Sequence, residues 1–154
     1  MLLHYIEAAA ELGTATQNDL NITIKKLRDR VGMPNLVANN IAVDPKWDFP
    51  TLSPLLNEIR RERRVELIGE GFRWNDITRW AAADELIVGQ RPKEFFGGQI
   101  TSQLIPVDEN GFLDPLKTSL PSGYGFKLNR DYLNSIPISE IVLNENLKQN
   151  LGWQ

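Results

Sequence analysis

The run of alternating charge at residues 58–73 constrains the fold of this chain more than any other part of the sequence. It contains five Arg and four Glu, and the Glu residues recur at every fourth position. Residues three or four apart are neighbours on an α-helix, so opposite charges meet along the surface of this segment if it is helical. Ser53 and Pro54 stand shortly before it and suit the N-cap and the first position of a helix. These features predict a helix that begins at Pro54 and ends near Gly69.

Three interpretations of this charged run compete. Two of its carboxylates could act as general acid and base, as in glycosidases, but neighbouring Arg side chains lower carboxylate pKa values, whereas an acid needs a raised one. The Arg residues could bind nucleic acid, with Trp74 and Trp80 stacking on bases, but the interleaved Glu residues and the net charge of −3 disfavour this. We favour a structural ion-pair network, in which planar Arg side chains bind carboxylates and clamp the helix to its neighbours.

This network is expected to hold the last helical hairpin and the C-terminal segment together. We therefore expect Trp74 and Trp80 in the core, and we expect Arg63→Ala or Glu66→Ala to lower stability by roughly 3–5 kcal/mol. We assign to the network Glu62, Arg63, Arg64, Glu66, Glu70, Arg73, Asp76 and Arg79.

The composition is that of a soluble globular protein and limits the chemistry available to it. Of 154 residues, 42% are hydrophobic and 24% are charged, which is typical of neither a disordered nor a membrane-spanning chain. There is no Cys and a single His, His4, so disulfide frameworks, thiolate metal sites and Cys nucleophiles are excluded, and His-based zinc sites or triads nearly so. No Gly-rich phosphate loop is present. We expect a protein that is not an enzyme and needs no cofactor or metal.

The first 32 residues are expected to form a helical hairpin. The first helix reaches Gly13, where a C-terminal cap would fall, and a second helix capped by Asn18 or Asp19 ends at Gly32. The apolar stripe of this second helix comprises Leu20, Ile24, Leu27 and Val31. Because no capping residue precedes the first helix, we expect Met1 to lie inside a longer protein.

The rest of the chain divides by composition. Residues 33–53 contain three Pro and are expected to form a loop, and residues 54–84 are expected to form a second hairpin. Residues 85–131 are rich in Gly and Pro and are expected to be irregular. Residues 132–154 are expected to form a C-terminal segment that wraps along the protein. It should be extended before Pro137, and a short helical turn should begin at Ser139 and Glu140. The predicted fold is mainly α, with tetratricopeptide-like helical hairpins, long irregular loops and an extended C-terminal segment.

Three ordered motifs carry a resemblance to a known family. Residues 62–80 read ERRVELIGEGFRWNDITRW and are similar to the ERRxEL…EGxRxxDLxRW signature of the SusD/RagB family. Upstream, YIEAAAELG at 5–13 and LRDRVGMP at 27–34 are similar to its YAEAxNELG and IRxRAGxP elements. Downstream, YLNSIPISEI at 132–141 and NENLKQNLGW at 144–153 resemble its ending, YLxPIPxxEI…NPxLxQNPGY, apart from a few turn residues.

The resemblance implies a function and a location. Members of this family are glycan-binding outer-membrane lipoproteins of Bacteroidetes, built on a helical solenoid. They cover a TonB-dependent, SusC-like transporter and capture oligosaccharide without catalysis. The motifs correspond to the C-terminal part of such a protein. The lipid anchor, the only expected membrane contact, and the export signal would then lie upstream of Met1.

Sugar contacts in this part of the chain would come from its loops. Aromatic faces pack against sugar rings, and polar side chains bind the hydroxyl groups. The candidates are Trp47, Asp48, Phe95, Phe96 and Tyr124, although for each aromatic we favour packing within the core or scaffold over sugar contact. The alternative function is a protein-interaction scaffold that recognises no sugar.

Overall fold

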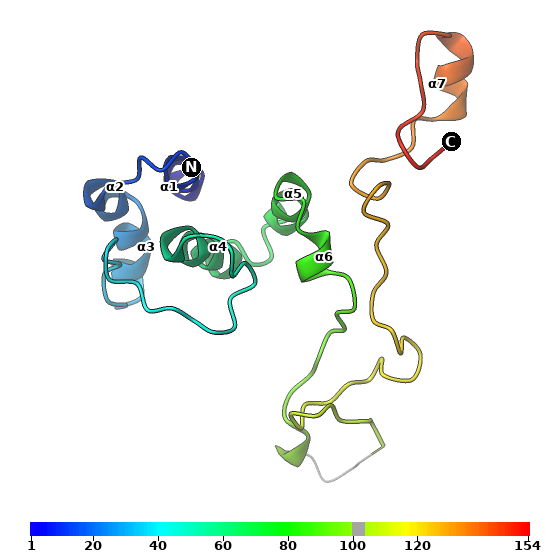
Figure 1. The fold of residues 1–154 in the computed structure, drawn as a ribbon. Helices are drawn as coiled ribbons and strands as arrows, with labels where there is room; N and C mark the ends of the chain where they lie inside the picture. Colours follow the sequence, from blue (N-terminus) through cyan, green and yellow to red (C-terminus); the bar gives the residue numbers. More distant parts are fainter. Residues whose placement is uncertain (100–103) are drawn as a thin grey trace. The chain divides into compact units, whose positions relative to one another are not determined.

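The chain is mainly helical, as the sequence predicts, in a computed structural model that describes residues 1–99 and 104–154. Among the described residues there is no β-strand, only two isolated β-bridges. The helices are short and long irregular segments connect them (Figure 1). They are α1 (Leu2–Glu11), α2 (Gln17–Ile22), α3 (Ile24–Arg30), α4 (Pro54–Glu66), α5 (Phe72–Arg79), α6 (Ala83–Leu86), the 3-10 helix η1 (Gly97–Gln99) and α7 (Ile138–Leu143).

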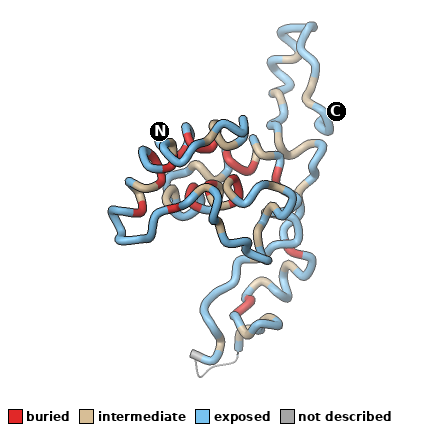
Figure 2. The backbone as a smooth tube through the Cα atoms, turned by 60° about the vertical axis from the view of Figure 1, so that its left-hand side comes forward, coloured by how far each residue is buried: buried red, intermediate tan, exposed pale blue. Residues whose placement is uncertain are grey.

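The chain forms two compact units, residues 1–76 and residues 77–154. In the first unit, α1 packs against α4, while α2 and α3 pack against each other and also contact α1. The buried residues in this unit follow the helices (Figure 2). Six of the buried apolar residues form one core cluster, which comprises Leu3, Ile6, Leu20, Ile24, Leu36 and Ile59.

The predicted second helix is two helices in the structure. The break falls at buried Thr23, whose φ of −120° and ψ of −90° are not helical. The N-cap is Thr16, so the prediction of Asn18 or Asp19 at this position is wrong. The Thr16 side chain accepts a hydrogen bond from the backbone N–H of Asp19, and the Asp19 carboxylate accepts one from the backbone N–H of Thr16 at 2.8 Å. This reciprocal capping box lies just upstream of the predicted position. Val31, at the end of the predicted stripe, is exposed.

The charged helix α4 begins as its sequence predicts. Ser53 is its N-cap, with Oγ accepting a hydrogen bond from the Leu56 N–H at 3.2 Å, and Pro54 is its first residue. The helix ends at Glu66, three residues before the predicted end, and turns follow up to Gly71.

The second unit is held by hydrogen bonds more than by helix packing. The backbone N–H of Ala83, in α6, donates to the hydroxyl of Tyr132 at 2.9 Å. Backbone groups of Gly89 and Gln90 pair with those of Tyr124, with both N···O distances 2.9 Å. Between α6 and α7 the described residues contain no α-helix, which agrees with the irregular character predicted for this stretch.

The C-terminal segment folds back on itself around α7. This helix begins at Ile138, one residue before the predicted start, and follows an irregular stretch that ends at Pro137. The side-chain amide of Gln149 bonds both the N–H and the C=O of Ile136, at 2.8 and 2.9 Å. The indole N–H of Trp153 donates to the carbonyl of Leu133 at 2.9 Å, so the chain end is tied to the start of the segment.

Candidate functional site

A buried ion-pair group joins three helices in the first unit. Arg63 of α4 is only 1% exposed, and its Nε lies 3.1 Å from a carboxylate oxygen of Glu7 in α1. Its Nη2 lies 2.8 Å from Asp76 in α5. Both carboxylates are buried as well. Because a planar guanidinium can bind two carboxylates at once, Arg63 links α1, α4 and α5.

A second buried group joins α3 to α4. The Nε of Arg28 donates to Glu62 at 2.7 Å, its Nη2 donates to Glu58 at 2.6 Å, and its Nη1 donates to the carbonyl of Pro34 at 3.1 Å. Hydrogen bonds from Arg61, and more weakly from Arg28, hold the pKa of Glu58 below its usual range. The sequence did not predict Arg28, Glu58 and Glu7 as members of the network. The pairs Arg28–Glu58 and Glu7–Arg63 each join residues far apart in the chain, and Arg28 and Glu7 lie outside the charged run at residues 58–73.

The other residues assigned to the network lie at its margins. Glu66 pairs with Arg30 at 2.8 Å and Arg64 with Asp48 at 3.5 Å, and three of these four side chains are substantially exposed. Glu70 is exposed and forms no ion pair with a described residue.

The two remaining Arg residues and the two Trp residues lie near α5. Burial, ahead of the nearby charge of Arg64, lowers the pKa of Arg73. The Arg79 guanidinium lies over the partly buried Trp80 ring, 5.0 Å from its centroid. Trp74 is half exposed, so the expectation that it belongs to the core is wrong.

A cavity of about 400 Å³ lies beside Trp47 in the first unit. Its walls come from the loop after α3 and from the charged faces of α3 and α4. Asp48, the other candidate in this loop, does not line it. The lining residues are Arg28, Asn35, Leu36, Val37, Asn40, Ile41, Ala42, Asp44, Trp47, Glu58 and Arg61.

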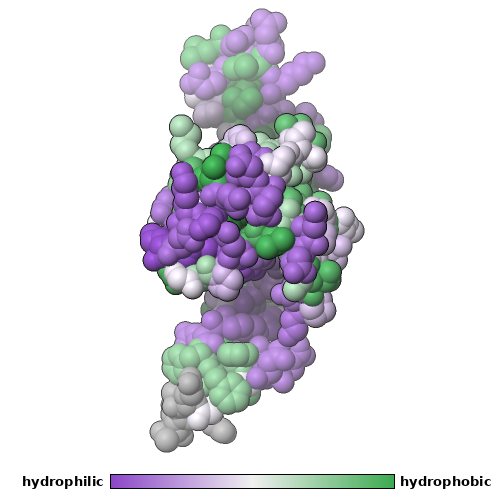
Figure 3. Space-filling model, turned by 90° about the vertical axis from the view of Figure 1, so that its left-hand side faces the viewer, coloured by the Kyte–Doolittle hydropathy of each residue, from purple (hydrophilic) through white to green (hydrophobic). Residues whose placement is uncertain are grey.

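The loop that forms this cavity is pinned at several points. The Gln17 side chain of α2 donates to the carbonyl of Leu36 and accepts from the N–H of Ala38, both at 3.0 Å. Further along the loop, Asp44 accepts from the N–H of Lys46 at 2.8 Å. The surface around α2 and α3 is mostly hydrophilic, with small hydrophobic patches (Figure 3).

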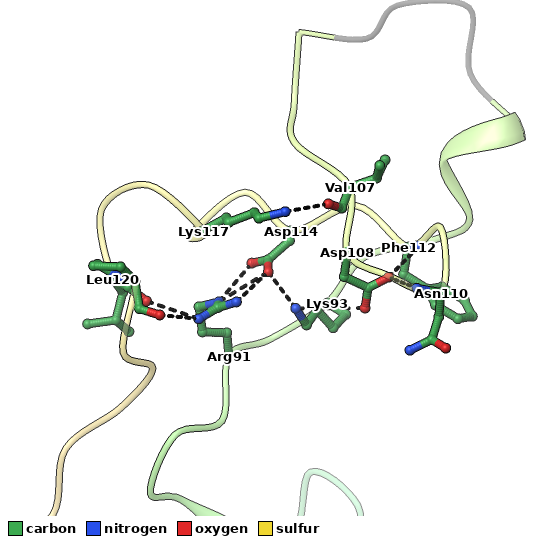
Figure 4. Close-up of polar contacts among 10 residues, drawn as sticks. Arg91, Lys93, Val107, Asp108, Asn110, Phe112, Asp114, Lys117 and Leu120 are labelled. Carbon is green, nitrogen blue, oxygen red and sulfur yellow. Dashed lines mark hydrogen bonds and ion pairs between the residues drawn. The ribbon is translucent and has the colours of Figure 1, made fainter.

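A separate polar cluster organises the irregular part of the second unit (Figure 4). Asp114 is fully buried and accepts hydrogen bonds from the Nη2 of Arg91 at 2.9 Å and from the Nζ of Lys93 at 2.5 Å. Hydrogen bonds from Arg91 and Lys93 lower its pKa to about 2. Arg91 also donates to the carbonyl of Pro121 at 2.7 Å. Sequence reasoning missed this cluster, because Asp114 lies more than 20 residues from both Arg91 and Lys93 and no spacing rule links them.

The aromatic candidates of the second unit are partly exposed. Phe95 and Phe96 are each about half exposed, and the Phe96 ring lies edge-on to Phe112 with centroids 6.0 Å apart. Tyr124 is 44% exposed, and its backbone pairs with the segment at Gly89. In the described part of the chain, no group of three or more His, Asp or Glu side chains could hold a metal ion.

Comparison with known protein families identifies the family of this chain. The model of the SusD family, SusD_RagB, matches residues 1–153. No curated protein and no solved structure matches the chain significantly.

Proposed function

The chain belongs to the SusD family, and from this membership we propose that it captures oligosaccharide for a SusC-like, TonB-dependent transporter of the outer membrane. SusD-family proteins bind their ligands and do not catalyse reactions. The observation that carries the proposal is the extent of the family match, which spans residues 1–153 and so includes all three ordered motifs.

The proposal places the protein at the cell surface as a lipoprotein. No helix in the described residues is long and apolar enough to cross a membrane. We propose that a lipid anchor attaches the protein to the outer membrane, as is typical of the SusD family.

A protein-interaction scaffold without sugar recognition is the second candidate, and α7 favours it. Ile138, Val142 and Leu143 are 74–81% exposed on this six-residue helix. Exposed apolar side chains in one place mark a surface that contacts another macromolecule. The macromolecule that contacts α7 could be the transporter itself, so protein contact at α7 is compatible with glycan capture.

Association with the transporter tests the proposal. The complete gene product is purified from its own outer membranes after mild detergent extraction, and co-purifying proteins are identified by mass spectrometry. We expect a TonB-dependent transporter in near-stoichiometric amount. Recovery of the protein alone, or with partners that include no such transporter, would contradict the proposal.

A further inference from the structure

We propose that the cavity beside Trp47 is a binding subsite for an uncharged sugar ring. This inference rests on the proposed function of glycan capture and adds both a place and a class of ligand to it. A volume of about 400 Å³ lies within the range of small-molecule sites and is large enough for one or two pyranose rings.

The wall of the cavity contains an aromatic face. Trp47 is neither buried nor fully exposed, so part of its ring packs on the protein and part borders the cavity. The axial C–H groups of a pyranose form an apolar face that packs on such a ring, which provides contact area at low entropic cost.

The same wall contains side-chain amides that can bind hydroxyl groups. Asn35 and Asn40 line the cavity, both are exposed, and neither side chain bonds another described residue. Each amide offers two N–H donors and a carbonyl acceptor, and a sugar hydroxyl both donates and accepts. Two amides and an aromatic ring in one cavity therefore match a polyhydroxylated ring.

The charges in the cavity wall favour an uncharged ligand. Arg28 and Arg61 are balanced by Glu58 and Asp44, so the charged lining sums to zero. Both cations are already engaged. Arg28 binds Glu58 and Glu62, and the Nε and Nη2 of Arg61 donate to Glu58 at 2.8 and 2.7 Å. A uronic acid would therefore find no cation in this wall that lacks a carboxylate partner, whereas a neutral hexose needs none.

The cavity is also preorganised. The hydrogen bonds from Gln17 fix the loop at residues 36 and 38, and the Nη1 of Arg28 fixes it at Pro34. A wall that is already ordered loses little conformational entropy when ligand binds, which favours affinity.

The test measures binding of defined hexasaccharides to the complete gene product by isothermal titration calorimetry. The probes are maltohexaose, cellohexaose and mannohexaose as neutral ligands, with hexagalacturonate as the acidic ligand of equal length. Trp47→Ala removes the aromatic face, and Asn40→Ala removes one exposed amide with little risk to folding. Matched controls are Trp74→Ala, a half-exposed Trp outside the cavity, and Asn39→Ala, the exposed neighbour of Asn40 that does not line it.

We expect one neutral hexasaccharide to bind, with affinity reduced at least tenfold by Trp47→Ala and at least threefold by Asn40→Ala. Both controls should stay within twofold of the unaltered protein. Equal affinity in all variants would overturn the subsite and leave glycan capture standing, because the sugar would bind elsewhere. Tighter binding of hexagalacturonate would overturn the uncharged ligand class. Absence of binding by every probe would overturn the subsite, while co-purification of the transporter tests the proposed function independently.

Discussion

Arg63 and Glu66 belong to the same sequence motif but differ in burial. Arg63 is almost fully buried between Glu7 and Asp76, whereas Glu66 pairs with Arg30, a largely exposed side chain. An ion pair near solvent is weak because water competes with it, and the removal of one partner from a buried pair leaves an uncompensated charge. The expectation of equal losses on substitution therefore has to be replaced.

Arg63→Ala should lower the free energy of unfolding by about 3–5 kcal/mol, because it removes the guanidinium that contacts two buried carboxylates, those of Glu7 and Asp76. Glu66→Ala should lower it by about 1 kcal/mol or less. Urea unfolding followed by circular dichroism measures both values. Equal losses in the two variants would show that the guanidinium of Arg63 does not hold the helices together as its contacts indicate.

The pH dependence of the second unit should follow Asp114. Its pKa is about 2 in the folded protein against an ordinary value of 3.8, because Arg91 and Lys93 donate hydrogen bonds to its charged form. A carboxyl group with a lowered folded-state pKa stabilises the fold above its unfolded pKa. This contribution should be fully present above about pH 5 and should be lost as the pH falls from 3.8 toward 2.

Asp114→Asn removes the titrating group, so its stability should change less over this pH range than that of the unaltered protein. Thermal unfolding at a series of pH values from 6 to 2.5 provides the comparison. Parallel pH profiles for the two proteins would mean that other carboxylates dominate acid unfolding.

At the scale of elements, the second unit contains a close backbone contact between the segments at Gly123 and Gly89. Gly123 has a φ of +72°, and a Cβ added there would lie 2.2 Å from the carbonyl oxygen of Gly89. Gly69 has a similar φ of +80°, but an added Cβ would meet no atom within 4 Å. Alanine substitutions at Gly69 and Gly123 therefore distinguish two energetic costs. Gly69→Ala has only the cost of a left-handed backbone conformation, and Gly123→Ala adds the cost of a steric clash.

Gly69→Ala should cost about 1–2 kcal/mol, which is the usual penalty for a side chain in the left-handed region. Gly123→Ala should cost clearly more, because the backbone at Gly89 must move and its hydrogen bonds with Tyr124 are disturbed. Thermal unfolding measures the difference, and amide hydrogen exchange at Tyr124 reports the local effect. Unchanged exchange at Tyr124 in Gly123→Ala would contradict the close contact.

Local sequence signals predicted helix boundaries well where the capping side chain and the backbone preference of the next residue favour the same boundary. Ser53 and Pro54 mark the start of α4 unambiguously, because cap and fixed φ act within one turn. The break at Thr23 was not predicted, since the apolar stripe continues through it from Leu20 to Ile24. The N-cap of α2 was misplaced because Asp19 takes part in the capping box as the third residue and not as the cap.

At the scale of the whole molecule, the ordered motifs predicted the family and the helical fold class. The sequence did not predict which residues distant in the chain contact one another. The sequence placed Trp47 among the candidate sugar contacts, but nothing in it indicated that Asn35 and Asn40 would line the same cavity. Their juxtaposition depends on how the loop crosses α3 and α4. The same holds for Asp114 and Arg91, which are 23 residues apart.

The central claim is that this protein captures glycan without altering it. Equilibrium titration of the complete gene product with a panel of soluble oligosaccharides, followed by chromatography of the recovered ligand, tests it most directly. We predict saturable binding of at least one oligosaccharide and recovery of that ligand at its original length. Shortened or modified ligand, or the absence of binding across a broad panel of neutral and acidic glycans, would contradict the claim.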